Sequence, residues 1–482
     1  MFCLRNKMMV KNDEKLTKSD FLLYCEAPRH LWAKRNGEIE QDLSDFTQHL
    51  ISEGFEVEKL AQDFFINNVL IHKPGFQISF QQTFSDGPFE ARTDALIYIP
   101  ATHTYELYEI KSSTSLDKTD LYDVTYQFLI LQKKVKIERV FITHLNKEYI
   151  RDGDLDLAQL FVVEDVTEKV QALLPEIDSL RQKAYSTFEC KDSNVLENCL
   201  SPKDCPCLEI CHPNLPEFSI FDIPRLSQRK KSELLVMGIR EAKDIPLAFS
   251  LNEKQQLIAE RAKTNSEYID RVSLRKELEG FQFPLWFLDY ETCISAIPRF
   301  NKYHPQQQIV FQYSLHKLEN LDGKLEHKGC IAVSDDDPSS LLLEHLKSDL
   351  GPTGTVIVWN KAFEMTMNKE MAKLYPDYES FLLDLNSRIY DLGEIVNQGI
   401  YIHPLFKGSW SIKHVLPVMV PELSYENMSI NKGDKASMAW WTITFGKLSD
   451  NEKKGILCNL DQYCELDTLA MVEIYKRFLT FL

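Results

Sequence analysis

The sequence predicts an α/β protein with more than one domain. Strand-like and helix-like segments alternate in two separate regions, and 482 residues exceed what one hydrophobic core usually spans. Hydrophobic residues make up 44% of the chain and charged residues 26%, a balance that excludes a disordered or collagen-like protein. We divide the chain into an N-terminal domain at 1–215, a helical connector at 216–280 and a C-terminal domain at 281–482.

The N-terminal domain should begin with a helix capped by Ser19, and a second helix is expected at 55–65. Alternating apolar residues then predict strands, two of them separated by a turn at 100–104. A further helix at 121–134 leads into the last strand of this domain. The expected strands are 76–84, 89–99, 105–111 and 139–145.

The connector is the most basic stretch of an acidic chain. The net charge is −17, yet residues 224–276 carry 12 basic and 7 acidic residues. Because an acidic surface repels nucleic acid, contact with a phosphate backbone needs such a local concentration of positive charge. Two helices around a turn at Gly238 would form a helix–hairpin–helix element, whose backbone N–H groups bind phosphate. A solvated helical linker is the alternative.

The C-terminal domain again combines strands, expected at 284–290, 309–316 and 355–359, with helices that end in one at 458–481. No stretch approaches the roughly 18 apolar residues that a membrane span needs. Residues 1–15 are rich in charge and lack the apolar segment of a secretory signal. We therefore expect a protein of the reducing cytoplasm, without membrane association.

The first group of chemically suggestive residues is Asp94, Glu109 and Lys111. Glu109 and Lys111 are two apart on an expected strand, so their side chains share one face, and Asp94 lies on the neighbouring strand. Two carboxylates beside a lysine favour a Mg²⁺ or Mn²⁺ site that acts on phosphate. A surface strand with alternating charges is the alternative.

The second group lies in the C-terminal domain. Asp289 and Glu291 are two apart on an apolar strand, where unpaired carboxylates are costly unless a metal compensates them. Tyr463 and Asp467 are four apart on a helix and share its face. Glu364 lies between these motifs, and the alternative or supporting carboxylate is Asp391. Loop capping and a solvated helix face would explain the same residues without chemistry.

The third group consists of cysteines. Cys199, Cys205 and Cys211 are evenly spaced, and Cys25 lies far upstream. Thiolates in fours hold zinc or an iron–sulfur cluster. Cys207 adds an alternative, because Cys199, Cys205, Cys207 and Cys211 would form a purely local zinc site.

The motifs ARTDALIYI and LYEIKSS resemble the PD-(D/E)XK nucleases of the RecB-like branch. This resemblance implies a restriction-endonuclease-like fold for the N-terminal domain. It also implies a metal-site role for Glu58 in GFEVE and a catalytic role for Gln127 in DVTYQFL. Iron–sulfur members of the branch place one cysteine before the nuclease core and three after it. The resemblance therefore assigns a [4Fe–4S] cluster to Cys25, Cys199, Cys205 and Cys211.

The motifs FLDYET, WNKAFE and YCELDTLAM resemble the DnaQ-like exonucleases of the ribonuclease H-like fold. The resemblance implies two metal ions, a water-orienting role for Tyr463, and four acidic ligands: Asp289, Glu291, Glu364 and Asp467. The middle motif of those enzymes ends in Asp, where this chain has Glu364.

Together with HLNKEYIRDGDL and GIYIHPLFKGSWSIKHVLPVMVPEL, these motifs resemble an uncharacterised bacterial family that joins the two domain types. The function this implies is a Mg²⁺- or Mn²⁺-dependent nuclease acting on DNA, with single-stranded ends as the expected substrate, in repair, recombination or defence. The alternatives are a nucleic-acid-binding scaffold whose DnaQ-like domain is inactive, which Glu364 favours, and a redox or iron sensor.

Overall fold

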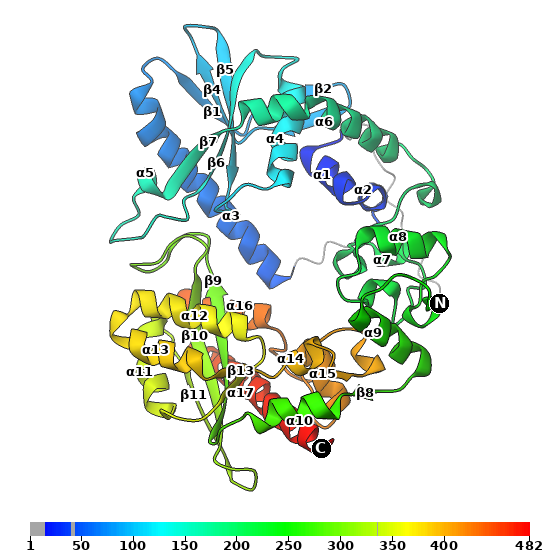
Figure 1. Ribbon diagram of the computed structural model, residues 1–482. Helices are drawn as coiled ribbons and strands as arrows, with labels where there is room; N and C mark the ends of the chain where they lie inside the picture. Colours follow the sequence, from blue (N-terminus) through cyan, green and yellow to red (C-terminus); the bar gives the residue numbers. More distant parts are fainter. Residues whose placement is uncertain (1–14, 40–43, 335) are drawn as a thin grey trace. The chain divides into compact units, whose positions relative to one another are not determined.

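The computed structural model describes residues 15–39, 44–334 and 336–482, and its helices and strands are drawn in Figure 1. The chain divides into two compact units. Unit 1 comprises Met1–Leu215 and the later segment Ala296–Gln306, and unit 2 comprises Pro216–Ser295 and Gln307–Leu482. The residues of the expected connector thus group with unit 2. The segment Ala296–Gln306, expected in the C-terminal domain, groups with unit 1.

Unit 1 combines a β-sheet with helices. Its strands are β1 (Gln77–Phe80), β2 (Thr83–Asp86), β3 (Phe89–Arg92), β4 (Ala95–Ile99), β5 (Thr104–Lys111), β6 (Ile137–Leu145) and β7 (Phe161–Asp165). Its helices are α1 (Lys18–Glu26), α2 (Pro28–Arg35), α3 (Asp45–Phe64), α4 (Lys118–Leu131), α5 (Leu157–Leu160), α6 (Thr167–Phe188) and α7 (Leu208–Cys211). The main sheet has the order β1-β4-β5-β6-β7, and β2 and β3 form a separate hairpin. β5 and β6 are parallel, a pairing that needs a crossover, and α4 supplies it.

Helices cover both faces of the main sheet in unit 1. Successive side chains of a strand point to opposite faces. On β5, Leu107 packs in an apolar cluster with α1, α4 and α6, whereas Tyr108 packs in a second cluster with α3. The sheet is therefore the middle layer of this unit, and its central strand β5 carries Glu109 and Lys111.

The N-terminal helices differ from the expectation in their limits. The first helix is capped by Thr17, not Ser19, because Thr17 and Asp20 exchange hydrogen bonds between side chain and backbone. It ends before Pro28, which begins α2, since the residue before a proline is pushed into extended backbone. The helix expected at 55–65 starts much earlier, at Asp45, where Ser44 is the cap.

Unit 2 also combines a sheet with helices, so the predicted α/β class is confirmed. Its strands are β8 (Tyr268–Ile269), β9 (Leu285–Ile294), β10 (Gln308–Leu318), β11 (Leu325–Ile331), β12 (Val356–Val358), β13 (Ile389–Asp391) and β14 (Tyr401–Ile402). Its helices are α8 (Gln228–Val236), α9 (Glu253–Thr264), α10 (Arg271–Glu279), α11 (Pro338–Asp349), α12 (Lys361–Leu374), α13 (Glu379–Ser387), α14 (Glu394–Asn397), α15 (Ile412–Met419), α16 (Gly433–Phe445) and α17 (Asp450–Leu479).

The main sheet of unit 2 has the order β11-β10-β9-β12-β13. β10 is antiparallel to both of its neighbours, whereas β9, β12 and β13 are parallel. Trp286, Leu288 and Tyr290 of β9 pack in one apolar cluster with α11, α12 and α13. The alternate residues Asp289 and Glu291 therefore face the other side, where α16 and α17 pack against β9.

The region around Gly238 does not form the two helices that a helix–hairpin–helix element needs. α8 ends at Val236, Gly238 has a positive φ of 77°, and the next helical segment is the 3₁₀ turn Ala242–Asp244. Residues 218–220 exchange backbone hydrogen bonds with residues 240–242, which occupies groups that a helix would use. Within the described residues, no helix has the length and apolar character required to cross a membrane.

Candidate active sites and metal centre

The structure brings the predicted residues Asp94, Glu109 and Lys111 together in unit 1. Asp94 lies between β3 and β4, where the chain bends, and its Oδ2 accepts a hydrogen bond from the N–H of Ile110 at 2.8 Å. Glu109 Oε1 is 3.1 Å from Lys111 Nζ, which also donates to Asp123 Oδ2 at 2.6 Å. The side chains of Glu109 and Asp123 are almost fully buried. These contacts make one compact charged cluster.

The sequence analysis missed two members of this cluster, Lys18 and Asp123. Lys18, the first residue of α1, donates to Glu109 Oε1 at 2.8 Å. The predicted Gln127 donates to Glu109 Oε2 at 2.7 Å and to Asp123 Oδ1 at 2.9 Å. Asp123 had a local signal, since it is four residues before Gln127 on one helix face. Lys18 had none, because it is 91 residues from Glu109.

Glu58 reaches this cluster through a glutamine. Gln81 has a left-handed backbone conformation between β1 and β2, with φ of 55°. Its Nε2 donates to Glu58 Oε1 at 2.6 Å and lies 3.4 Å from Asp94 Oδ1. The helix α3 thus presents Glu58 beside the strand residues, one hydrogen-bonded side chain away from Asp94.

The carboxylates of this cluster are electrostatically unequal. Burial opposes the ionisation of Glu109, but the ammonium groups of Lys18 and Lys111 outweigh it and hold its pKa well below the usual range. Burial and then the charge of Glu109 raise the pKa of Asp94 to about 8. Burial alone would lower the pKa of Lys111, but Glu109 and Asp123 raise it above its usual value. Lys111 therefore carries a positive charge at neutral pH.

The second cluster lies in unit 2 between β9 and α17. One carboxylate oxygen each from Asp289 and Glu291 and the Sγ of Cys464 all lie within 4.8 Å of one another. The next turn of α17 contributes the predicted Asp467, whose Oδ1 accepts a hydrogen bond from Tyr425 at 2.6 Å. Cys464 and Tyr425 carried no recognisable signal in the sequence.

Tyr463, the predicted water-orienting residue, is buried and held by a lysine. Lys413 Nζ lies 3.1 Å from the Tyr463 hydroxyl and also 3.1 Å from the backbone oxygen of Asn431. Its ammonium group sits over the rings of both Tyr463 and Tyr425. This lysine thereby brings positive charge to a cluster of acidic groups.

Glu364 lies in the first turn of α12 with 2% of its surface exposed. Among the described residues, its Oε2 has no hydrogen-bond partner. Burial and then the charge of Asp289 raise the pKa of Glu364 to about 9. Burial and neighbouring carboxylates also raise the pKa values of Asp289 and Glu291 well above the ordinary range. If these carboxylates were all ionised, their negative charge would exceed the positive charge of Lys413, so the donor set fits a cation.

Replacing Glu364 with glutamine is expected to flatten the pH dependence of stability of the metal-free protein. The folded pKa is raised, so the folded state keeps a proton that the unfolded state releases. Stability is therefore lost as pH rises, by up to about 1.4 kcal/mol per unit for such a group. Thermal unfolding in EDTA from about pH 5 to about pH 8 measures the slope. The control is Glu344→Gln, on the exposed face of α11, which should have the same slope of stability against pH as the unmodified protein. Equal slopes for Glu364→Gln and the unmodified protein would contradict the raised pKa of Glu364 in the folded protein.

Asp391, the alternative carboxylate, is occupied by hydrogen bonds to the backbone. It lies at the end of β13 and accepts hydrogen bonds from the backbone N–H groups of Asn360, Lys361 and Gly393. Two of these N–H groups belong to Asn360 and Lys361 at the start of α12, the helix that carries Glu364. Asp391 thus supports the position of Glu364 and has little capacity left for another ligand.

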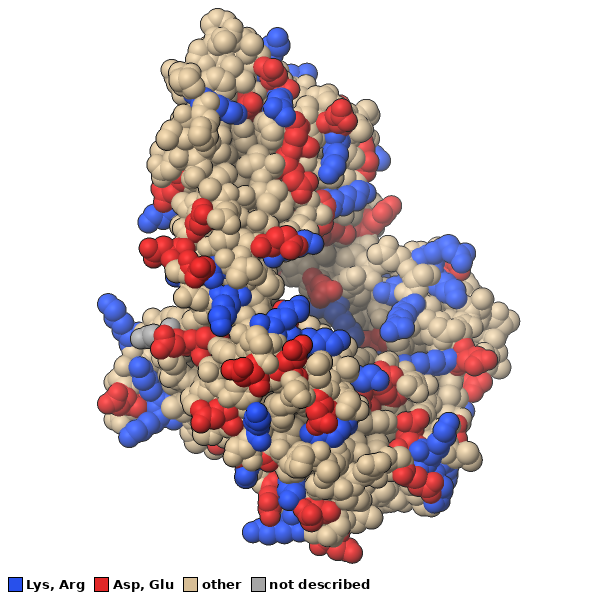
Figure 2. Space-filling model, turned by 60° about the vertical axis from the view of Figure 1, so that its left-hand side comes forward, with Lys and Arg blue, Asp and Glu red and all other residues tan. Residues whose placement is uncertain are grey.

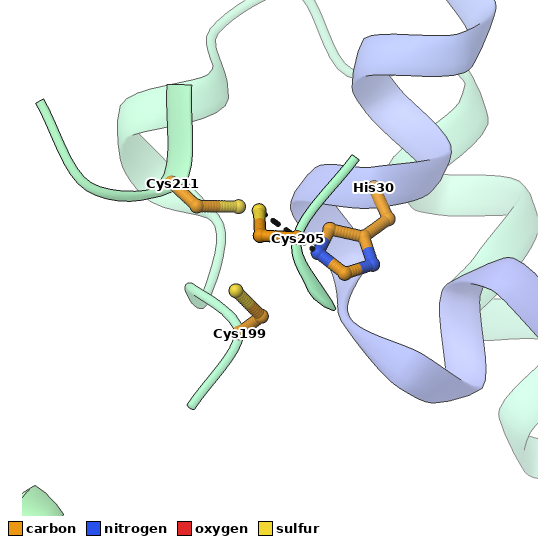
Figure 3. Close-up of side chains that lie close together, drawn as sticks. All are labelled: His30, Cys199, Cys205 and Cys211. Atoms are coloured by element: carbon orange, nitrogen blue, oxygen red, sulfur yellow. Dashed lines mark hydrogen bonds between the residues drawn. The ribbon is translucent and has the colours of Figure 1, made fainter. Parts of the chain in front are cut away.

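A third cluster in unit 1 contains sulfur and nitrogen donors. The Sγ atoms of Cys199, Cys205 and Cys211 and one ring nitrogen of His30 all lie within 4.8 Å of one another. Figure 3 shows the side chains of this set, with His30 supplied by α2. Cys25 is exposed on α1 and is not part of the set. The fourth donor of this group is His30, a residue that the sequence analysis did not select.

Some basic side chains of the connector form ion pairs with acidic residues of the same segment. Arg229 pairs with Glu233 at 2.8 Å and Lys243 pairs with Glu241 at 2.5 Å. On the face drawn in Figure 2, basic and acidic side chains are interspersed. Both acidic partners belong to the connector itself, so its excess of basic over acidic residues remains.

Comparisons with known proteins find relatives without a described activity. A family model described as a domain of unknown function (DUF2779) matches residues 286–411. Uncharacterized protein MG366 of Mycoplasma genitalium is 27% identical over 208 residues, which cover 39% of this chain and 31% of the relative. Its homolog in Mycoplasma pneumoniae is 26% identical over 215 residues, which cover 40% and 32%. The chain spans about a third of the length of these curated relatives.

These matches are consistent with the uncharacterised family that the sequence resembles, and they name no activity. Among solved structures, the crystal structure of SSO0001 is similar over 43% of this chain and 90% of that chain. The sequence identity is 14% and the TM-score is 0.25.

Proposed function

We propose that this protein is a metal-dependent nuclease that hydrolyses DNA phosphodiester bonds, with single-stranded ends as its substrate. One observation carries the proposal: each unit gathers largely buried carboxylates on the central strands of its sheet, in β5 and in β9. Such groups are costly without compensation, and carboxylate oxygens are the ligands that Mg²⁺ and Mn²⁺ prefer. The two clusters lie in separate units, so each is a candidate site by itself.

Unit 1 supports assignment to a RecB-like PD-(D/E)XK nuclease domain through the placement of its polar residues. Asp94 precedes β4, Glu109 and Lys111 share a face of β5, and Gln127 lies on the crossover helix α4. In this proposal Asp94, Glu109 and Glu58 hold the metal. Lys111 stays protonated, so it acts as a hydrogen-bond donor and a positive charge beside the scissile phosphate. Gln127 fixes Oε2 of Glu109, whereas Oε1 lies against the ammonium groups of Lys18 and Lys111.

Unit 2 supports assignment to a DnaQ-like domain of the ribonuclease H-like fold through its strand order and its acidic cluster. In the main sheet, β11, β9, β12 and β13 all run in one direction, and β10 alone runs in the opposite direction. In this proposal Asp289, Glu291, Glu364 and Asp467 are the metal ligands. Tyr463 orients water through its hydroxyl, which Lys413 holds in place.

Mg²⁺ or Mn²⁺ would polarise the scissile phosphate and lower the pKa of a bound water at either site. The protein's own contribution is to keep the ligands in fixed positions before substrate arrives. Tyr425 restrains Asp467, and Asp123 restrains both Lys111 and Gln127. The additional thiol of Cys464 favours Mn²⁺ over Mg²⁺ at the second site, because sulfur is the softer ligand.

Nuclease assays on the purified 482-residue chain test this proposal. End-labelled single-stranded DNA, double-stranded DNA and RNA would be incubated with Mg²⁺ or Mn²⁺. The unmodified protein should shorten single-stranded DNA, and the double variant Lys111→Ala/Asp289→Ala should not. Identical behaviour of the two proteins on every substrate would overturn the proposal. DNA binding without cleavage by either protein would instead favour the scaffold function.

A further inference from the structure

The His30 cluster of unit 1 has the geometry of a centre for one metal ion. Zinc takes sulfur at about 2.3 Å and imidazole nitrogen at about 2.0–2.1 Å, so donor atoms around one tetrahedral ion lie roughly 3.5–3.8 Å apart. Here the four donors lie within 4.8 Å of one another, and Cys205 Sγ is 3.4 Å from His30 Nε2. Figure 3 shows the three sulfur atoms close together and the His30 ring directed at Cys205. The donors are therefore close enough to share one ion.

We propose that His30, Cys199, Cys205 and Cys211 bind a single divalent ion of the zinc type. This centre replaces the [4Fe–4S] cluster that the sequence assigns through Cys25. It is independent of the proposed nuclease function, since it uses none of the residues of the two carboxylate clusters.

The environment of His30 supports a ligand role. His30 is buried in the first turn of α2, and its Nδ1 lies 3.2 Å from Glu26 Oε2. A carboxylate on one ring nitrogen fixes the tautomer and directs the other nitrogen to the metal, as in carboxylate–histidine–zinc arrangements. Glu26 is thus a positioning residue. The short break between α1 and α2 at Pro28 lets these two residues approach each other.

The donor set fits zinc better than an iron–sulfur cluster. A [4Fe–4S] cluster is held by four cysteine thiolates. Cys25, the proposed fourth thiolate, is exposed and lies outside the set, whereas the imidazole of His30 lies within it. Three thiolates and a neutral imidazole leave one net negative charge around a divalent ion.

Cys207 is a less favourable fourth ligand than His30. Its Sγ lies 3.7 Å from Cys211 Sγ, and its thiol donates to the backbone oxygen of Arg29 at 3.9 Å. Ligation by Cys207 instead of His30 would add a second net negative charge. The cluster packs against Ala27 and Ala33, where excess charge is poorly solvated.

The metal would tie two distant parts of unit 1 together. His30 and Cys205 are 175 residues apart, and Arg29 already joins the same two segments by donating to the backbone oxygens of Leu196 and Ile210. An ion that closes so long a loop restricts the unfolded chain and stabilises the folded unit. Its role is therefore structural, and it holds α2 against the segment that ends with α7.

Metal analysis of the 482-residue chain, purified without oxygen, tests the proposal. The expected protein is colourless and contains one zinc ion per chain, which Cys25→Ser and Cys207→Ser retain and His30→Ala loses. Glu26→Gln should weaken zinc binding by about 10-fold or more. A brown protein with about four iron atoms per chain would overturn the proposal. So would zinc that survives His30→Ala but is lost in Cys207→Ser, or a protein free of bound metal.

Cobalt substitution keeps the test valid if His30→Ala fails to fold. Co²⁺ in the unmodified protein should give the visible absorption of a tetrahedral ion and a thiolate charge-transfer band. His30→Cys should retain the ion with a stronger charge-transfer band, because a thiolate replaces the imidazole. An unchanged spectrum in His30→Cys would exclude His30 as a ligand. None of these measurements depends on nucleic-acid cleavage, so failure of the nuclease proposal would leave them unaffected.

Discussion

Lys111→Ala is expected to reduce cleavage by unit 1 by about 10²–10⁴-fold. Lys111 Nζ lies 2.6 Å from Asp123 Oδ2 and 3.1 Å from Glu109 Oε1, and the raised pKa keeps it charged. The alanine variant lacks the hydrogen-bond donor beside the proposed phosphate position. It also lacks the ammonium group that contacts Glu109 and helps to hold that carboxylate in place. The measurement is the initial rate of Mn²⁺-dependent shortening of single-stranded DNA. It should be made in an Asp289→Ala background, so that only unit 1 contributes.

Lys118→Ala is the matched control for this experiment. Lys118 is also a lysine of unit 1, but it is exposed at the start of α4 and its Nζ is 3.8 Å from Glu176. Its removal should leave the rate unchanged. Thermal unfolding of both variants separates loss of chemistry from loss of folding. Undiminished cleavage by a folded Lys111→Ala variant would exclude this cluster as the active site.

Asp289→Asn is expected to reduce cleavage by unit 2 by about 10²–10⁴-fold and, at the same time, to stabilise the metal-free protein. Burial and then the charge of Asp467 raise the pKa of Asp289, so the ionised form is unfavourable in the fold. Asparagine removes that charge. The opposite signs of the two effects are typical of a site where stability is lost for function. The cleavage rate should be measured in a Lys111→Ala background, and thermal unfolding in EDTA and in Mn²⁺.

Asp461→Asn provides the control, because Asp461 is exposed on the same helix as Asp467. It should change neither cleavage nor the gain in stability that Mn²⁺ produces. The unmodified protein should be stabilised by Mn²⁺, and Asp289→Asn should lose most of that gain. If unit 2 binds DNA without cutting it, and Asp289→Asn does not alter stability, the scaffold function is the better description.

Local patterns in the sequence predicted the parts of each candidate site that share one element. Glu109 and Lys111 are two apart on β5, and Asp289 and Glu291 are two apart on β9, so strand periodicity alone aligned them. Tyr463 and Asp467 are aligned in the same way by the helix α17. The α/β class followed from the same periodicities.

Partners from distant elements had no such pattern. Lys18, Gln81 and Tyr425 contact site residues through chain folding, and nothing near them in the sequence indicates which carboxylate they meet. The limits of several elements also differed. The expected strand at 89–99 divides into β3 and β4 at Asp94, whose carboxylate binds the backbone of β5.

Sequence alone determined which residue types are present and, through the repeat distances of helices and strands, which of them lie on one face of an element. Only the tertiary structure decided how those faces meet. It placed Ala296–Gln306 with unit 1 and set the strand order of both sheets. In unit 1 it placed His30, and not Cys25, within 4.8 Å of the sulfur atoms of Cys199, Cys205 and Cys211. The reason is that His30 lies five residues after Cys25 and on a new helix that begins at Pro28, so its side chain points in a different direction. Whether a side chain can bind a ligand depends on its position in space as well as on its chemistry.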